Sequence, residues 1–251
     1  MKRHKWKLLL LALLICLAFA SAAVAVKPVI DGVEKSIEVK KAVEEYRETV
    51  TEIREEAESA ETDEETEKPQ EVIPYAQLYD DIQTYNRELY LFKQNKLDCK
   101  SAYEQSQFML TDYGLPDETF GIITIPKMDL EMPLFLGASE ANMAAGAAVL
   151  SQTSIPLGGV NSNSVIAGHR GYSGYPYFKE IELLEPGDEV IITNIWGTLT
   201  YVVTGIKIIN PNDVNAILIQ RGKDMITLLT CHPYASGGKY RYLVFCERVE
   251  E

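Results

Sequence analysis

A cysteine near the end of the chain, Cys231, has the setting that a nucleophile requires. It follows the strand-like run MITLLT and precedes a loop that contains Pro233, Gly237 and Gly238. Where a strand opens into such a loop, a thiol can meet substrate. A cysteine at a strand end can equally be a small packed hydrophobic residue, so a nucleophile would need a base nearby.

The three histidines of the chain differ in their suitability as that base. His4 lies before the apolar run at the N-terminus. His232 adjoins Cys231, and because successive strand residues point to opposite faces, its ring is poorly placed to take the thiol proton. His169 follows the strand-like run SVIAG between two glycines, which let the backbone turn and a substrate approach closely. We therefore predict His169 as the acid/base and His232 as a loop residue.

An arginine could complete the site, because acyl transfer needs positive charge near the thiolate and donors near the oxyanion. Arg241 begins the run RYLVF after a connection of hairpin size, so the two strands should pair with Arg241 near Cys231. Arg170 is the alternative, but it follows His169 directly and would face the other way. The predicted pairing would exclude a disulfide between Cys231 and Cys246. Cys246 lies roughly 16 Å beyond Arg241 along the same strand, and its side chain points to the opposite face.

The chain from residue 120 onward has the pattern of an all-β core. Short apolar runs are bounded by Gly, Pro, Asn or Asp, and they are FGIITI, SVIAG, EVIITNI, LTYVVTGIKII, MITLLT and YLVF. Such spacing predicts a barrel or a sandwich with a site at the strand ends. Before this core, apolar residues at helical spacing predict a helical lead-in over 75–119, with Cys99 packed in it.

The N-terminal end of the chain predicts a membrane segment. Basic residues precede an uncharged stretch over 8–26, which at about 1.5 Å per residue nearly spans a ~30 Å hydrocarbon core. Small residues at 20–23 would permit cleavage, but the run is longer than an ordinary signal peptide, which favours a retained anchor. Residues 1–7 should then stay in the cytoplasm, with the rest of the chain outside the cell.

Residues 27–74 are predicted to form an acidic stalk. Between Asp31 and Glu71 the chain has sixteen acidic and six basic residues, which accounts for −10 of the net charge of −13. Apolar residues at three- and four-residue steps from Val39 to Ile53 could form an amphipathic helix, while AESAETDEETEKPQE has too little apolar surface to become ordered. We interpret the segment as a spacer, with an acidic docking site as the alternative.

Charge and cysteine content exclude some classes of function. No basic stripe accompanies the acidic segment, so binding to nucleic acid is not expected. Of the four cysteines, Cys16 lies in the apolar run, which leaves three in the exported part and at least one of them free.

Several of these segments together resemble the sortase family. The stretches TSIPLGGVNSNSVIAGHRG, GDEVIITN and TLLTCHPY, the last followed by YRYLV, look like the signature segments of sortases, and the order His, Cys, Arg agrees. The resemblance covers about Tyr75 to Arg248 and looks most like class C, the pilin-polymerising group, in IPKMDLEMPLFLG and the helical lead-in. It implies a mainly β fold, a closed eight-stranded barrel with N-terminal helices, whose catalytic domain covers 120–251.

The sortase resemblance also implies a reaction. Cys231 would be the nucleophile that cleaves an LPxTG-like sorting signal between Thr and Gly, and an amine would resolve the thioester. His169 would protonate the leaving amine, Arg241 would hold the scissile carbonyl, and Thr230 would assist the oxyanion. The partners would be surface proteins or pilins that bear the motif, together with an acceptor amine from a pilin lysine or a cell-wall peptide. No cofactor and no metal are implied.

Two features depart from the class C pattern. Class C sortases commonly carry an Asp-Pro-aromatic lid before the barrel, but SQFMLTDYGLPDETFG has no such triplet, which predicts an open or differently covered site. They often end in a second transmembrane helix, whereas residue 251 follows soon after RYLVFCERVE, so the N-terminal segment is expected to be the anchor.

Two other functions remain open at this point. An exported cysteine protease would use the same Cys231 and His169 with water in place of the amine, because nucleophile and base do not specify the acceptor. A non-catalytic β-barrel binding module outside the cell would have Cys231 merely packed. Product analysis with and without an amine, together with the reactivity of the thiol, separates the three possibilities.

Overall fold

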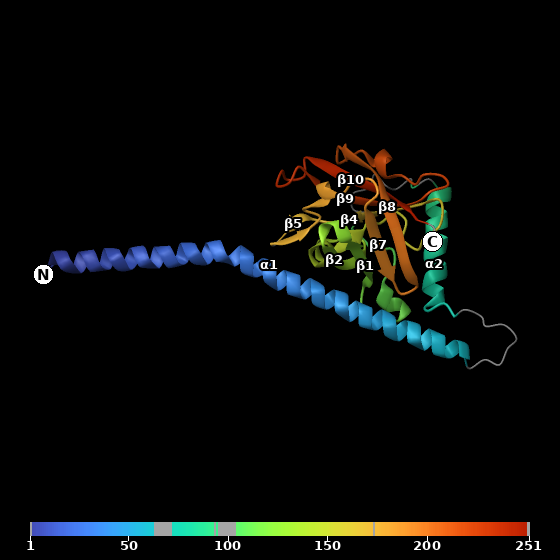
Figure 1. The fold of residues 1–251 in the computed structure, drawn as a ribbon, viewed down its shortest axis with the longest axis horizontal. Helices are drawn as coiled ribbons and strands as arrows, with labels where there is room; N and C mark the ends of the chain where they lie inside the picture. Colours follow the sequence, from blue (N-terminus) through green and yellow to red (C-terminus); the bar gives the residue numbers. More distant parts are fainter. Residues whose placement is uncertain (1, 63–71, 93, 95–103, 173, 250–251) are drawn as a thin grey trace.

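Apolar residues that alternate along the second half of the chain close into a β-barrel, which two helices flank (Figure 1). The computed structural model describes residues 2–62, 72–92, 94, 104–172 and 174–249; within the first helix it describes the backbone but not the side chains of 2–15, 18–23, 25 and 60–62. The helices are α1 (Lys2–Thr62), α2 (Ala76–Leu91) and α3 (Glu140–Ala145), with the 3-10 turns η2 (Leu110–Tyr113), η3 (Pro126–Met128), η4 (Ile181–Leu183) and η5 (Val214–Ile217). The strands are β1 (Thr119–Ile125), β2 (Leu130–Leu136), β3 (Ala147–Val149), β4 (Ser162–Ala167), β5 (Arg170–Tyr172), β6 (Tyr175–Tyr177), β7 (Glu189–Asn194), β8 (Gly197–Ile209), β9 (Asp224–His232) and β10 (Tyr240–Arg248).

Eight strands close the barrel in the order β1-β2-β3-β4-β9-β10-β8-β7, and β7 pairs back to β1. The pairs β2–β3 and β4–β9 are parallel, and the other neighbours are antiparallel. Closure gives each of the eight barrel strands a partner on both sides, and the interior is filled by apolar side chains such as Ile122, Met132, Ile192 and Leu228. Strands β5 and β6 pair with each other as a separate hairpin.

The predicted all-β core is confirmed, and the six strand-like runs of the sequence correspond to β1, β4, β7, β8, β9 and β10. The sequence does not single out β2 or β3 as strands. β2 contains Pro133, which is unusual inside a sheet because it lacks a backbone donor, and β3 has only three residues. The parallel ladder between them begins at Leu134, so the missing donor does not interrupt it.

One face of α1 packs against the barrel along residues 39–53. The steps of three and four residues put its apolar positions on one side of the helix, and the buried ones are Val39, Val43, Tyr46 and Val50. Tyr46 Oη donates a hydrogen bond to the Phe120 carbonyl at 2.6 Å, and Arg54 Nη2 donates to the Asn194 carbonyl at 2.8 Å. The predicted amphipathic helix is confirmed, and this part of α1 is fixed to the barrel.

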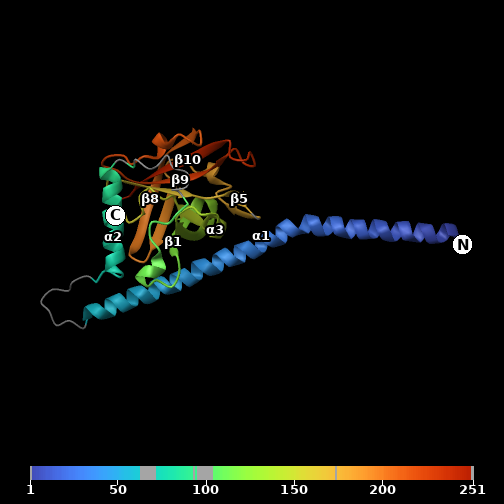
Figure 2. The ribbon, with the colours of Figure 1, turned by 180° about the vertical axis from the view of Figure 1, so that it is seen from behind.

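Helix α2 covers another side of the barrel (Figure 2) and buries Leu78, Ile82 and Leu89. The side-chain amide of Asn86 donates to the Ile155 carbonyl and accepts from the Ile155 amide, each at 2.8 Å. The predicted helix is confirmed over Ala76–Leu91.

The predicted membrane segment, residues 8–26, belongs to α1, but most of its side chains lie outside the described residues. Within the part of the chain that the structure describes, no helix is long and apolar enough to cross a membrane. Residues 63–71 of the predicted stalk and Cys99 also lie outside the described residues. The anchor and the domain boundaries after residues 7, 26, 74 and 119 therefore stay predictions.

Shortening a barrel-facing side chain of α1 should destabilise the fold. Val43 is 4% exposed, so Val43→Ala should lower the free energy of unfolding by about 1.5–3 kcal/mol, through lost burial and the cavity that remains. Val33→Ala makes the same change of helix propensity at a position that is 55% exposed, and it should have little effect. Urea unfolding of both variants makes the comparison, and equal effects would show that α1 does not pack on the barrel.

Candidate active site

Cys231 lies near the C-terminal end of β9, with β4 on one side and β10 on the other. β4 runs parallel to β9 and pairs Ala167 with Leu229. Continuing this register by two residues brings His169 level with Cys231. β10 runs antiparallel to β9 and pairs Arg241 with Cys231, which confirms the predicted hairpin contact. The sheet thus brings the three predicted residues to one rim of the barrel.

The imidazole of His169 contacts two tyrosine rings of the β5–β6 hairpin. Tyr172 stacks on it, with 4.6 Å between ring centroids and 19° between ring planes. Tyr177 meets it nearly edge-on, with 5.9 Å between centroids and 79° between planes. Among the described residues, none hydrogen-bonds to a ring nitrogen of His169. The ring contacts therefore orient the imidazole and leave its nitrogens available for proton transfer.

The guanidinium of Arg241 is oriented by the loop between β9 and β10. Arg241 Nη1 donates to the Gly238 carbonyl at 2.8 Å and to the Tyr240 carbonyl at 3.1 Å. Gly238 has a φ of +79°, and a Cβ there would lie 3.2 Å from Cys231 Sγ and 3.0 Å from Arg241 Nη1. A glycine is therefore required for this loop to lie so close to both groups. The sequence marks Gly238 only as a turn residue.

The Thr230 side chain points to the opposite face from the thiol. Thr230 is 1% exposed, and its Oγ1 donates to the Gly168 carbonyl at 2.7 Å. Cys231, the next residue along the strand, is exposed. The Thr230 hydroxyl thus fixes the residue before His169, and this geometry does not support its predicted help to an oxyanion.

His232 and Arg170 bind each other on the face of β9 away from the thiol. Arg170 Nη1 lies 2.9 Å from His232 Nδ1, and Glu182 Oε1 lies 2.6 Å from Arg170 Nη2 and 3.1 Å from His232 Nδ1. The hydrogen bond from Arg170 is the main cause that holds the pKa of Glu182 below its ordinary value. Arg170 Nη1 also donates to the Cys231 carbonyl at 3.3 Å. The cluster, whose Glu182 the sequence does not single out, ties the backbone of Cys231 to the residue after His169.

An apolar groove of about 420 Å³ leads to Arg241. Leu229 lies in its lining and is on the same face of β9 as Cys231, because the two residues are two positions apart. Its other apolar lining residues include Ala138, Leu150, Ile209, Val214 and Ile217. A groove of this kind fits the apolar side chains of an extended peptide.

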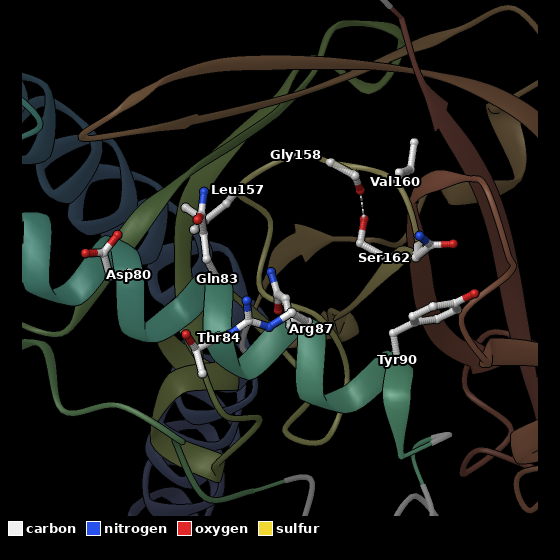
Figure 3. Close-up of a pocket in the computed structure, with 12 residues that line it drawn as sticks. Asp80, Gln83, Thr84, Arg87, Tyr90, Leu157, Gly158, Val160 and Ser162 are labelled. Carbon is white, nitrogen blue, oxygen red and sulfur yellow. Dashed lines mark hydrogen bonds between the residues drawn. The ribbon is translucent and has the colours of Figure 1, made fainter. Parts of the chain in front are cut away.

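A second hollow, of about 580 Å³, lies away from the thiol, between α2 and residues 157–162 (Figure 3). Gln83, Thr84 and Arg87 of α2 are among the polar residues that line it. It borders the start of β4 at Ser162, whereas His169 follows the other end of that strand. This hollow is therefore not part of the candidate active site.

Cys246 is chemically unlike Cys231. It is buried and free, and burial raises the pKa of its thiol to about 12, so it is almost never ionised near neutral pH. It pairs with Ile226 on β9, five positions from Cys231, so no disulfide joins the two cysteines. Of these two barrel cysteines, Cys231 is exposed and is the one whose thiol can react.

Burial lowers the pKa of the His169 imidazole below its ordinary 6.5, and the negative charge of Glu140 opposes this shift. The neutral ring therefore predominates at pH 7, and the protonated ring is a stronger acid than an exposed imidazolium. Such a group can give a proton to a departing amine and take one back.

A family model described as the sortase domain matches residues 123–249, so the chain belongs to the sortase family. Sortase D of Bacillus subtilis strain 168 is 29% identical over 131 residues, which cover 51% of this chain and 63% of that protein. The chain thus matches less than two thirds of the length of this relative.

Two solved structures of class C sortases are also similar. Sortase C1 of GBS pilus island 1 has a TM-score of 0.68 and 26% identity, over 83% of this chain and 97% of that one. Sortase C from Clostridium perfringens SM101 has a TM-score of 0.62 and 25% identity, over 84% of this chain and 99% of that one. These matches cover more of the chain than the barrel alone, so the likeness to class C extends to the helices.

The lowered pKa of His169 predicts its titration. In a proton NMR titration of the ring, the midpoint should fall below 6.5. Because the folded pKa lies below the unfolded one, the stability that the neutral ring provides is complete above pH 6.5 and is lost as the pH falls further. A midpoint at or above 6.5 would contradict the buried environment.

Proposed function

We propose that this chain is a sortase that cleaves an LPxTG-like sorting signal between Thr and Gly and transfers the acyl group to an amine. Membership of the sortase family supports a cysteine transpeptidase reaction. The observation that carries the proposal is the strand register, which pairs Arg241 with Cys231 and, continued by two residues beyond the pair Ala167–Leu229, brings His169 level with Cys231 on the other side. The acceptor is a lysine of a pilin or an amine of a cell-wall peptide, and the likeness to class C structures favours the pilin.

The first half of the reaction forms a thioester. The thiolate of Cys231 attacks the threonine carbonyl carbon, and the C–N bond to glycine breaks. The imidazolium form of His169, which is the minority form at pH 7, donates its proton to the leaving nitrogen, so the glycine side departs as a neutral amine. The lowered pKa of His169 favours this transfer.

The second half of the reaction transfers the acyl group. The acceptor amine attacks the thioester carbonyl, the C–S bond breaks, and neutral His169 takes the proton from the attacking nitrogen. Cys231 leaves as a thiolate, so both groups return to their starting states. Water in place of the amine would give hydrolysis by the same steps.

Arg241 stabilises the negative charge that develops on the carbonyl oxygen. Its guanidinium stays charged at any working pH, and carbonyls of the β9–β10 loop hold Nη1. The remaining N–H groups can then donate to the oxyanion. The apolar groove beside Arg241 accepts the leucine and proline that precede the scissile bond.

We also propose that residues 8–26 anchor the chain in the cell membrane, with residues 1–7 in the cytoplasm and the barrel outside. The basic residues before the apolar run support this orientation. From Val26 to Val39, where α1 begins to bury side chains on the barrel, the helix rises about 20 Å at ~1.5 Å per residue. The barrel would therefore lie close to the membrane on a short helical arm.

Replacing the nucleophile should abolish the covalent intermediate. After incubation with an LPxTG-type peptide and acid quenching, intact-mass spectrometry should show the acyl part of the peptide on the wild-type chain and none on Cys231→Ala. Cys16→Ala, which changes a cysteine far from the barrel, should form the adduct normally. An adduct on Cys231→Ala would end the assignment.

The product formed in the presence of an amine identifies the acceptor class. Triglycine, or a peptide that contains a lysine, should yield an amide product at the expense of the free acid. If only the free acid forms, the chain is an exported cysteine protease. If no adduct forms and iodoacetamide leaves Cys231 unmodified, it is a binding module.

Variants of His169 and His232 test which side chains of β9 point toward the active site. His169→Ala should lower kcat/KM by about 10²–10⁴-fold, because it removes the acid/base. His232→Ala should lower it less than about 10-fold, since its ring lies beside Arg170 and Glu182 on the other face. Arg241→Ala should cost about 10²–10³-fold as a lost oxyanion donor, and Arg170→Ala should cost less. An equal loss at both histidines would reverse the assignment.

A further inference from the structure

The β5–β6 hairpin begins one residue after His169 and carries both rings that contact it. Tyr172 on β5 pairs with Tyr175 on β6. The Phe178 amide donates to the His169 carbonyl at 2.9 Å, which closes the hairpin on this residue. The place of the imidazole therefore depends on the shape of the hairpin.

The two tyrosines that contact His169 are held differently. Tyr177 is 1% exposed, and its Oη donates to the Ala144 carbonyl at 2.6 Å, so its ring is a fixed wall. Tyr172 is 42% exposed, and its backbone pairs with Tyr175, but none of the described residues hydrogen-bonds to its hydroxyl. Its stacking on His169 therefore depends on where the hairpin holds it.

Helix α1 contacts the turn of this hairpin through two glycines (Figure 1). A Cβ on Gly32 of α1 would lie 2.7 Å from the Gly174 carbonyl oxygen. A Cβ on Gly174 would lie 2.6 Å from the Pro28 carbonyl oxygen, and Gly174 has a φ of +78°. A residue larger than glycine at Gly32 or at Gly174 would prevent the two backbones from lying this close.

A second contact fixes the hairpin beside α1. Tyr175 Oη donates to the Glu131 carbonyl of β2 at 3.4 Å, and the Glu131 carboxylate forms an ion pair with Arg47 of α1. The hairpin is therefore enclosed by α1 at its turn and by β2 at its side.

We propose that α1 positions the catalytic histidine. The Gly32–Gly174 contact fixes the hairpin turn, and the turn fixes the position of Tyr172. The Tyr172 ring stacks on one face of the His169 imidazole and holds it against the ring of Tyr177. Tyr172 is thus a positioning residue of an imidazole that has no hydrogen-bonded partner among the described residues. The inference rests on the proposed function of His169 as acid/base.

Variants of Tyr172 test the stacking. In thioester formation with an LPxTG-type peptide by the full chain, Tyr172→Ala should lower kcat by about 10-fold or more and leave KM within about twofold, because a misplaced group slows chemistry more than binding. Tyr172→Phe keeps the ring and should retain most of kcat. Normal kcat in Tyr172→Ala, or an equal loss in both variants, would overturn the role of the stack.

A methyl group at the glycine contact tests the link to α1. Gly32→Ala should weaken the nuclear Overhauser effect between the Tyr172 and His169 rings and lower kcat in the same assay. Alanine is a better helix former than glycine, so the loss would not come from a weaker α1. Gly205→Ala is the matched control, because a Cβ there meets nothing within 4 Å. An unchanged ring contact and kcat in Gly32→Ala would overturn the proposal.

The ring contact is measured without substrate, so its outcome is separate from that of the proposed function. If the wild-type chain forms no adduct, the proposed sortase reaction is wrong. The nuclear Overhauser effect between the Tyr172 and His169 rings, and its loss in Gly32→Ala, can still be measured and decides the positioning role separately. If the adduct forms and the Tyr172 variants turn over normally, the reaction stands and the positioning role alone is wrong.

Discussion

The parallel pairing of β4 with β9 is the constraint on which the site depends. Parallel strands run in the same direction, so the residues that follow them emerge at one rim of the sheet. His169 follows β4 and Cys231 lies at the end of β9, which brings together two segments separated by the β5–β6 hairpin, β7 and β8. β10 then returns antiparallel to β9 and adds Arg241 on the other side of the thiol.

Alternation along β9 divides the site into a reacting face and a supporting face. Leu229 and Cys231 point toward the groove and Arg241, while Thr230 and His232 point the other way. Both side chains on the supporting face have a partner, since Thr230 donates a hydrogen bond to the Gly168 carbonyl and the His232 ring binds Arg170. These contacts hold the backbone on either side of the thiol and leave the thiol itself open.

The sequence predicts local features of this arrangement well. The six apolar runs identify most of the barrel, the spacing of Val39 to Val50 identifies the buried face of α1, and the hairpin between Cys231 and Arg241 follows from loop length. The alternation rule separates His232 from Cys231 without any knowledge of the fold.

The sequence does not reveal what depends on contacts between distant segments. Nothing near Glu182 indicates that it binds Arg170 and His232, and nothing near Tyr172 indicates that it stacks on His169. The sequence does not reveal β2 because this strand contains Pro133, which lacks a backbone N–H donor. The ladder between β2 and β3 begins at the next residue, so the missing donor does not interrupt it. Thr230 adjoins Cys231 in sequence, but its hydroxyl is taken by Gly168, a partner that only the β4–β9 pairing supplies.

The most direct test of the register is a crystal structure of the chain with an LPxTG-type peptide analogue that carries a thiol at the threonine position, joined to Cys231 by a disulfide. The predicted result has the apolar peptide residues in the groove along Leu229, the carbonyl beside the thiol within about 3 Å of an Arg241 N–H group, and His169 on the other side of Cys231. A peptide that leaves Cys231 along the face of Arg170 and His232, with Arg241 far from its carbonyl, would contradict this account.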